Sequence, residues 1–176
     1  IKYCNSKGLK TEYKRPLSLS KSNSNVIDAI IHGVDWLKKY KGINFETILI
    51  LQPTTPLRYL WEIKKALKDF KSKKTNSMVS VTPMREHPYE CIEKTKNNWK
   101  FIKKAGKTVF RRQQFKKNFY FIDGSFYIIK TSFLKKYKKL IKEKKTKMFI
   151  LKRNWPIDID YKEDLLVANA LIKKNK

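Results

Sequence analysis

Cysteine, glycine, arginine and long apolar runs are all scarce in this 176-residue chain. Cys4 and Cys91 stand far apart without a CxxC neighbour, which argues against a zinc site or a disulfide framework. Two free thiols suit a reducing compartment, so we expect a cytoplasmic protein. No apolar run approaches the ~20 residues of a membrane span and no signal peptide is visible, so we expect no membrane partner.

Acidic residues are also few, with Lys+Arg 42 against Asp+Glu 15 and a net charge of +27 at pH 7. Such a charge first suggests a nucleic-acid or anionic-membrane partner. The basic residues are nearly all lysine, however, whereas arginine is favoured for guanine edges and bidentate phosphate contacts. The chain also lacks an RRM, KH or zinc signature. We therefore favour a compositional bias over a specific nucleic-acid partner, with a basic nucleic-acid-binding protein as the alternative.

Apolar residues make up 41% of the chain, enough for one globular domain over residues 1–176. Apolar spacing predicts helices at 26–39, 59–70, 131–144 and about 161–173, the first one capped by "SLSKSNSN". Short apolar runs predict strands at 47–51, 77–82, 120–129 and 147–151, and 90–118 is ambiguous, with a hairpin as one solution. This alternation predicts an α/β fold with ligands at the carboxyl ends of its strands.

The segment "QPTTPLR", residues 52–58, follows the predicted strand at 47–51. Gln52 can contact a sugar hydroxyl or a base edge, or it can satisfy the backbone of the turn, and both interpretations remain open. Thr55 before Pro56 predicts a helix N-cap followed by proline at the first helical position. Gly124, inside the strand predicted at 120–129, indicates a bulge or a close backbone approach.

The scarce acids gather in "NWPIDIDYKED", residues 154–164. In a strand, Asp158 and Asp160 point to the same face about 6–7 Å apart, an arrangement that suits Mg²⁺. As an alternative, Asp160 and Glu163 have the spacing of a helix capping box. The two roles are compatible.

The segment "RRQQ", residues 111–114, holds two of the rare arginines side by side. Arg111 and Arg112 can bind a carboxylate or phosphate in bidentate fashion, or they can belong to a solvated loop. His32 and His87 have no nucleophile nearby and are interpreted as structural or positioning residues.

Together and in this order, the segments resemble the acylneuraminate cytidylyltransferase family, also called CMP-sialic acid synthetases. "LQPTTPLR" resembles the family signature LQPTSPLR, and "KRPLSLS" resembles the Arg-Pro segment that precedes the first long helix. "VSVTPMREHP", "RRQQ" with "DGSFYI", and "IDID" resemble later segments. The resemblance covers essentially the whole chain. It implies a mixed, mostly parallel sheet with helices on both faces, nucleotide-diphospho-sugar transferase-like and Rossmann-like.

The resemblance also implies an activity, in which a sialic-type nonulosonic acid attacks CTP to give the CMP-sugar and pyrophosphate. It implies Mg²⁺ as cofactor, CTP and a sugar acid as ligands, and a homodimer in which 90–118 reaches the partner subunit. The implied site residues are Arg15 near the nucleotide, Gln52, Arg112 and Asp123 facing the sugar acid, and Asp158 and Asp160 holding Mg²⁺; of these, Arg112, Asp158 and Asp160 would be catalytic.

Three departures from the family pattern matter. The family opens with a strand and a Gly- and Lys-containing loop for the CTP phosphates, which this sequence does not supply, so we expect residues 1–176 alone to be inactive. Asp123 stands where the family usually has Asn, which leaves legionaminic or pseudaminic acid open as the substrate. Pro156 replaces the usual small polar residue before "IDID".

Overall fold

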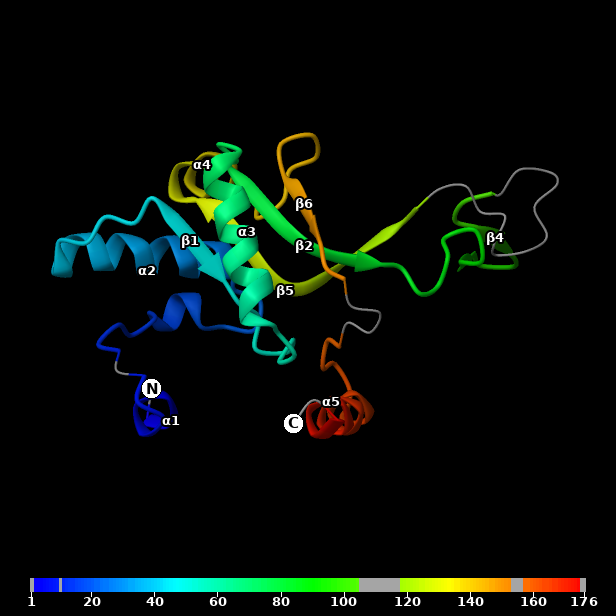
Figure 1. Cartoon of the computed structure of the whole chain (residues 1–176), viewed down its shortest axis with the longest axis horizontal. Coiled ribbons are helices and arrows are strands. Elements are labelled where there is room, and N and C mark those ends of the chain that lie inside the picture. Colours follow the sequence, from blue (N-terminus) through cyan, green and yellow to red (C-terminus); the bar gives the residue numbers. More distant parts are fainter. Residues whose placement is uncertain (1, 10, 105–117, 153–156, 175–176) are drawn as a thin grey trace. The chain divides into compact units, whose positions relative to one another are not determined.

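The structure is a computed structural model that describes residues 2–9, 11–104, 118–152 and 157–174. Figure 1 shows its helices and strands along the chain. In chain order the elements are α1 (Lys2–Ser6), a 3-10 helix (Leu17–Leu19), α2 (Val26–Lys41), β1 (Thr47–Ile50), α3 (Leu60–Ser72), β2 (Ser77–Pro83), β3 (Ile92–Lys94), β4 (Trp99–Phe101), β5 (Tyr120–Lys130), α4 (Thr131–Tyr137), β6 (Lys147–Ile150) and α5 (Lys162–Lys174).

The main sheet has four strands in the order β1-β5-β2-β6. β1 pairs antiparallel with β5, with Thr47 opposite Lys130 and Ile50 opposite Tyr127. The expectation of an α/β fold with a mixed sheet is confirmed. The expectation of mostly parallel strands is wrong, because the sheet is mostly antiparallel with one parallel pair and is not clearly Rossmann-like.

Each helix boundary has a local cause where the cap is visible. The Asn25 side chain accepts a hydrogen bond from the backbone N–H of Ile27, which confirms the cap expected from "SLSKSNSN". α4 ends at Tyr137, well short of the expected 131–144, because Lys138 adopts the left-handed conformation that closes a helix.

The chain divides into two compact units. The first comprises 1–50, 67–78 and 127–147. Its core is formed by Ile129, Phe133 and Leu134, against which apolar side chains of α2 and β1 pack. Ion pairs join Lys138 to Asp28, at 3.3 Å, and Lys135 to Asp35, so α4 is also held to α2 by charge.

The second unit comprises 51–66, 79–126 and 148–176. Phe126 and Phe149 are buried and their ring centroids lie 5.6 Å apart. Ser80, Thr82, Asp123 and Ser125 are also buried in this unit, and buried polar groups need hydrogen-bond partners. This unit contains the segment that follows β1, the glycine of β5 and the segment that follows β6. The expectation of a single domain stays a prediction.

β3 and β4 form a separate two-stranded antiparallel sheet, with Ile92 opposite Phe101 and Lys94 opposite Trp99. The hairpin within 90–118 is therefore confirmed, while 105–117 lies outside the described residues.

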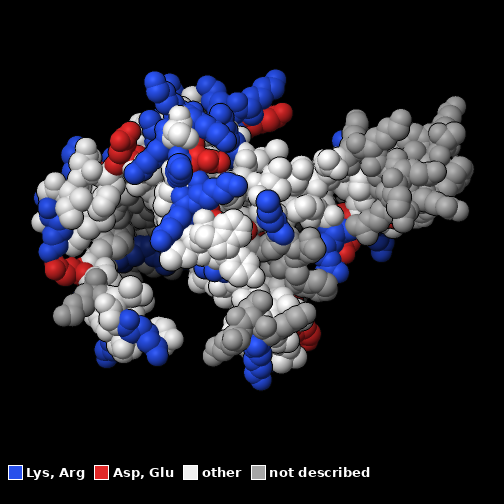
Figure 2. All heavy atoms as spheres, in the orientation of Figure 1, with Lys and Arg blue, Asp and Glu red and all other residues white. Residues whose placement is uncertain are grey.

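Lysine and arginine side chains are spread over the face shown in Figure 2, with few acidic side chains between them. Within the residues that the structure describes, no helix combines the length and the apolar character needed to cross a bilayer.

Candidate active site

The loop between β1 and α3 is anchored by a buried threonine. Thr55 is fully buried, and its hydroxyl donates to the backbone carbonyl of Asp123 at 3.4 Å. Its backbone N–H donates to the carbonyl of Gln52 at 3.2 Å. The expectation that Thr55 caps a helix is wrong, because α3 begins at Leu60 and Thr55 instead ties its own loop to β5.

Arg58 makes a second link between this loop and β5. Its Nε donates to the carbonyl of Ser125 at 2.7 Å, and one of its terminal nitrogens donates to the carbonyl of Gln52. A planar guanidinium can span two acceptors in this way, whereas a lysine ammonium cannot hold the same fork. Arg58 is not among the residues predicted above, although a rare arginine that closes the "LQPTTPLR" segment is a signal in the sequence.

Gly124 allows the closest approach in the site. Its φ is +70°, and a Cβ atom built there would collide with the side-chain oxygen of Gln52 and lie 3.0 Å from the hydroxyl of Thr55. The prediction of a close backbone approach is thus confirmed. The Gln52 side chain lies against the β5 backbone at Gly124. Only glycine, which has no Cβ atom, leaves room for it there.

Asp123 is a buried carboxylate, with 1% of its surface exposed. It accepts hydrogen bonds from the Ser80 hydroxyl at 2.6 Å, the Ser125 hydroxyl at 2.8 Å and the Ser125 backbone N–H at 3.2 Å. These donors compensate for the loss of water around the charge. Ser80 and Ser125 were not selected from the sequence, although a serine within an apolar strand signals a buried partner. Direct contact of Asp123 with a sugar acid stays a prediction.

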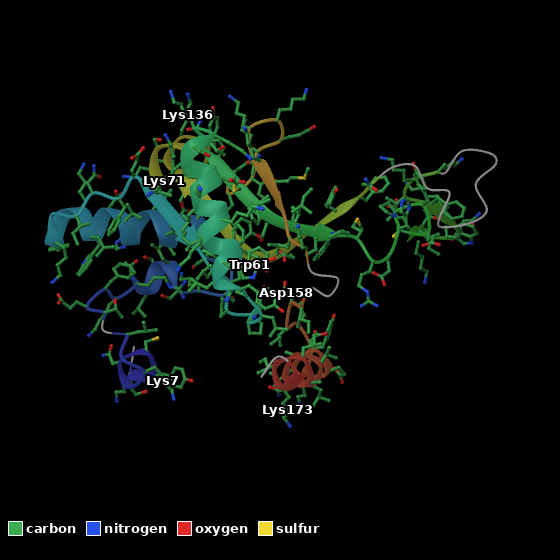
Figure 3. The ribbon with its side chains drawn as sticks, in the orientation of Figure 1. Lys7, Trp61, Lys71, Lys136, Asp158 and Lys173 are labelled. Carbon is green, nitrogen blue, oxygen red and sulfur yellow. The ribbon has the colours of Figure 1, made fainter. Side chains whose placement is uncertain are left out.

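The acidic segment after β6 is attached to the same loop. The backbone N–H of Ile159, between the two aspartates, donates to the carbonyl of Thr54 at 2.8 Å. Figure 3 labels Asp158 in the connection that leads from β6 to α5. One oxygen of Asp158 is buried and has no hydrogen-bond partner among the described residues. An orphaned carboxylate oxygen is costly, so it marks a position where a ligand would be stabilising.

The start of α5 is capped by Asp164. Its carboxylate accepts from the backbone N–H groups of Asp160, at 3.0 Å, and Tyr161, at 2.8 Å. The alternative of a capping box between Asp160 and Glu163 is therefore not supported. Asp160 is exposed, and in the part of the chain that the structure describes its carboxylate accepts no hydrogen bond.

The magnesium site expected at Asp158 and Asp160 stays a prediction, for which the chain offers two carboxylates, the oxygen ligands that Mg²⁺ prefers. Among the described residues, no group of three or more histidines, cysteines and acids could hold a metal. Mg²⁺ is compatible with so few protein ligands, since it keeps several waters and commonly shares substrate phosphates. The orphaned oxygen of Asp158 is the observation that favours this fit.

The arginines expected at the site are not tested by the structure. Arg15, in the first unit, donates from Nε to the hydroxyl of Ser20 at 3.2 Å. Arg111 and Arg112 lie outside the described residues. The roles of Arg15 and Arg112 therefore stay predictions. The segments of Gln52, Asp123 and Asp158 are connected by hydrogen bonds that end on backbone carbonyl oxygens.

Both histidines have structural partners. The Tyr13 hydroxyl lies 3.0 Å from Nδ1 of His32. His87 is 9% exposed and packs against the rings of Tyr89 and Phe119. These contacts agree with their interpretation as positioning residues.

Comparison with known proteins adds two distant relatives, and no family model matches the chain. The chain is 25% identical over 162 residues to the "Post-translational flagellin modification protein B" of Campylobacter coli, covering 92% of this chain and 68% of that protein. It is 24% identical over 163 residues to the "N-acylneuraminate cytidylyltransferase" of Streptococcus agalactiae, covering 93% of this chain and 38% of that protein. The chain is thus similar, at low identity, to one protein named as a cytidylyltransferase and to one named as a flagellin modification protein.

Proposed function

We propose that this chain is a cytidylyltransferase that activates a sialic-type nonulosonic acid with CTP. The observation that carries the proposal is the acidic segment, where an orphaned oxygen of Asp158 lies in a stretch bonded to the "QPTTPLR" loop. The name of the streptococcal relative, an N-acylneuraminate cytidylyltransferase, supports the same class of activity. In the proposed reaction the anomeric hydroxyl of the sugar acid attacks the α-phosphorus of CTP. A new O–P bond forms, the bond between the α-phosphorus and the oxygen of the β-phosphate breaks, pyrophosphate leaves, and the hydroxyl proton passes to solvent.

Asp158 and Asp160 would hold Mg²⁺, which supplies a Lewis acid for the phosphate oxygens. The chain's own residues would then mainly position the reactants, as is usual in transfer at phosphorus. Gln52 offers an amide that both donates and accepts, which suits the hydroxyl and carboxylate groups of a sugar acid. Arg58 and Thr55 would fix Gln52 by holding its loop against β5.

Besides its predicted contact with the sugar acid, Asp123 would support the backbone beneath Gln52. Its carboxylate is occupied by Ser80 and Ser125, and it therefore sets the backbone of Gly124 against which Gln52 lies. Arg112 would face the sugar acid and Arg15 the nucleotide, where a guanidinium suits a carboxylate or phosphate.

The proposed assembly is a cytoplasmic homodimer joined through the β3–β4 hairpin. The hairpin and the residue after it expose apolar side chains, namely Ile92, Trp99, Phe101 and Ile102, at exposures from 44% to 65%. Exposed aromatic and aliphatic groups clustered on two short strands are typical of a surface that is covered in an oligomer.

Two alternatives remain. Legionaminic or pseudaminic acid would replace the sialic-type acid without changing the chemistry. A basic nucleic-acid-binding protein would bind the phosphate backbone through its charge of +27, and the site around Gln52 and Asp158 would have no role in binding.

A pyrophosphate-release assay tests the proposed function. The natural protein that contains residues 1–176 is mixed with Mg²⁺, a nine-carbon keto sugar acid and one of CTP, ATP, UTP or GTP. We expect pyrophosphate only with CTP and only when the sugar acid is present. Equal turnover of all four nucleotides, or no release with sialic, legionaminic and pseudaminic acids, contradicts the proposal.

A further inference from the structure

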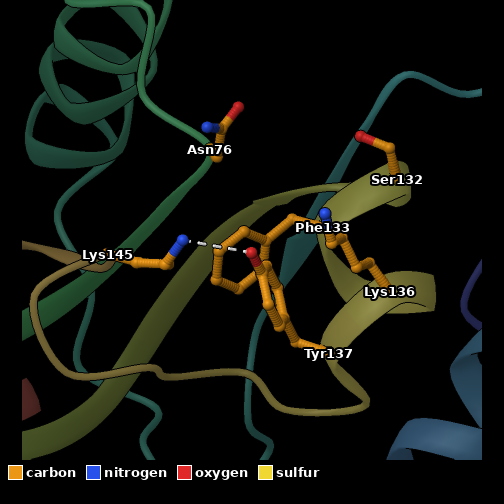
Figure 4. Close-up of a pocket in the computed structure, with 6 residues that line it drawn as sticks. All are labelled: Asn76, Ser132, Phe133, Lys136, Tyr137 and Lys145. Carbon is orange, nitrogen blue, oxygen red and sulfur yellow. Dashed lines mark hydrogen bonds between the residues drawn. The ribbon is translucent and has the colours of Figure 1, made fainter.

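The first unit contains a cavity of about 340 Å³ that the proposed function does not use. Its lining residues are Asn76, Ser132, Phe133, Lys136, Tyr137 and Lys145. Figure 4 shows α4 contributing four of them, with Asn76 and Lys145 coming from the segments before β2 and before β6. A cavity of this size lies at the lower end of the range typical of small-ligand sites, about 300–1,000 Å³.

Three ammonium groups surround the Tyr137 side chain. The Nζ atoms of Lys136, Lys142 and Lys145 lie 5.6, 4.7 and 5.4 Å from the ring centroid. Lys145 also donates a hydrogen bond to the Tyr137 hydroxyl at 3.2 Å, drawn as the dashed line in Figure 4. The arrangement concentrates positive charge around one phenol at the edge of the cavity.

In the described part of the chain these three lysines have no carboxylate partner, unlike three other lysines of the same unit. Lys130, Lys135 and Lys138 pair with Glu46, Asp35 and Asp28 respectively. Across the described ranges, none of Lys136, Lys142 and Lys145 forms an ion pair. Like charges held this close repel one another, so a multiply charged anion between them would be stabilising.

The phenol responds to this charge. The pKa of Tyr137 lies below its ordinary value of 10.0, chiefly because Lys145 donates a hydrogen bond to its oxygen, with further lowering by the charges of Lys145, Lys136 and Lys142. An anion that neutralised the lysines would raise this pKa again, which makes Tyr137 a reporter for occupancy.

The chemistry of the lining selects a class of anion. Lysine ammonium groups act as compact point charges rather than as planar forks, and they suit phosphate oxygens. The Asn76 amide and the Ser132 hydroxyl can donate to further oxygens. Phe133 is buried and cations already surround the Tyr137 ring, so little aromatic face remains for stacking a nucleobase.

We propose that this pocket is a binding site for a pyrophosphate group, either as free pyrophosphate or as the phosphate tail of a nucleotide. The inference rests on the pocket alone and does not require the proposed transferase activity.

Calorimetry with sodium pyrophosphate tests the site directly. The variant Lys136→Gln/Lys145→Gln removes two lining charges. The matched control Lys139→Gln/Lys147→Gln removes the same net charge from two exposed lysines of the same stretch that do not line the cavity. The pocket variant should weaken pyrophosphate binding about tenfold or more, because it loses charge-assisted contacts, and the control by less than about twofold. Equal losses in the two variants, or no saturable binding to the parent chain, overturn the proposal.

Two further measurements sharpen the result. Displacement of pyrophosphate by CTP but not by cytidine assigns the site to the phosphate tail of a nucleotide; absence of displacement by CTP assigns it to free pyrophosphate. NMR titration of ¹³C-labelled tyrosine, with Tyr137→Phe to assign the resonance, should show the Tyr137 pKa rising when pyrophosphate is bound. An unchanged Tyr137 titration at saturating pyrophosphate contradicts binding in this pocket.

Discussion

Gly124 stands at a point of β5 where a side chain has no room. Any other residue at this position would lower the free energy of unfolding for two separate reasons. Its φ is positive, and the Gln52 side chain fills the space that a Cβ atom would need. Sequence analysis could predict the special backbone, because a glycine inside an apolar strand is a local signal. It could not predict that Gln52 is the neighbour, because that contact depends on how two distant segments fold together.

The variant Gly124→Ala should therefore be more harmful than an alanine at another left-handed glycine. Gly42, at φ 65°, is the matched control, since a Cβ atom added there would have nothing within 4 Å. Each alanine should cost about 1–2 kcal/mol for the backbone, and at residue 124 overpacking should add about 1–3 kcal/mol. Chemical denaturation measures the difference. Similar unfolding free energies for the two variants would show that Gln52 does not occupy the space assigned to it.

Asp158 and Asp160 are the residues whose roles are most open to a direct test. If they hold Mg²⁺, Asp158→Asn and Asp160→Asn each remove a ligand charge while keeping the shape of the side chain. Both variants should stay folded and lose most cytidylyltransferase activity, with partial rescue by excess Mg²⁺ or by Mn²⁺.

A thermal melt of each asparagine variant serves as the folding control for this prediction. Near-normal activity in both variants would show that Asp158 and Asp160 do not hold Mg²⁺.

At the scale of elements, the sequence predicts where α5 starts but not which side chain caps it. The acids of "DYKED" predicted a helix start here, and the helix begins at Lys162. The capping side chain, however, is Asp164, which reaches back to two backbone N–H groups. The local sequence offers two carboxylates at similar spacing, and the one chosen depends on a helix boundary that sequence patterns leave uncertain by one or two residues.

The variant Asp164→Ala should destabilise the second unit by about 1 kcal/mol, the usual cost of losing a cap. Glu163→Ala is the control, since Glu163 is an exposed acid in the same turn without a capping bond among the described residues. Urea unfolding followed by circular dichroism measures both. A larger loss of unfolding free energy for Glu163→Ala than for Asp164→Ala would instead support the capping box of Asp160 and Glu163.

The apolar runs in the sequence predicted the positions of the strands well, but they did not predict how the strands pair. The run "TILIL" predicted a buried strand of a parallel sheet, whereas β1 pairs antiparallel with β5 at the end of the strand order and Leu49 is 37% exposed. A short apolar run indicates extended structure but carries no information on the direction of its neighbour. Similarly, the lysine-rich stretch 131–144 has helical periodicity throughout, and only the left-handed Lys138 shows where α4 stops.

At the scale of the whole molecule, the charge of +27 has to be reconciled with the proposed transferase activity. The ion pairs in the described part of the chain are exposed, as with Lys41 and Glu12 at 2.6 Å, and such pairs contribute little to stability. Most lysines among the described residues are exposed, and Figure 2 shows them on one side of the molecule, so a polyanion would meet a diffuse positive surface.

We expect binding to a short DNA duplex to be weak and independent of sequence. Such binding would be driven by the release of counterions from the DNA. The affinity should therefore fall by about a thousandfold or more between about 50 and 200 mM salt. Fluorescence anisotropy with two unrelated duplexes measures this. Sequence-selective binding that persists at physiological salt would favour the nucleic-acid alternative.

The most direct test of the central claim is ³¹P NMR of a mixture of CTP, Mg²⁺, N-acetylneuraminic acid and the natural protein that contains residues 1–176. We predict that the CTP signals are replaced by one phosphodiester signal and pyrophosphate in equal amounts, and that Asp158→Asn does not support this change. Pyrophosphate or orthophosphate appearing without the phosphodiester, or product formed equally by Asp158→Asn, would contradict the account.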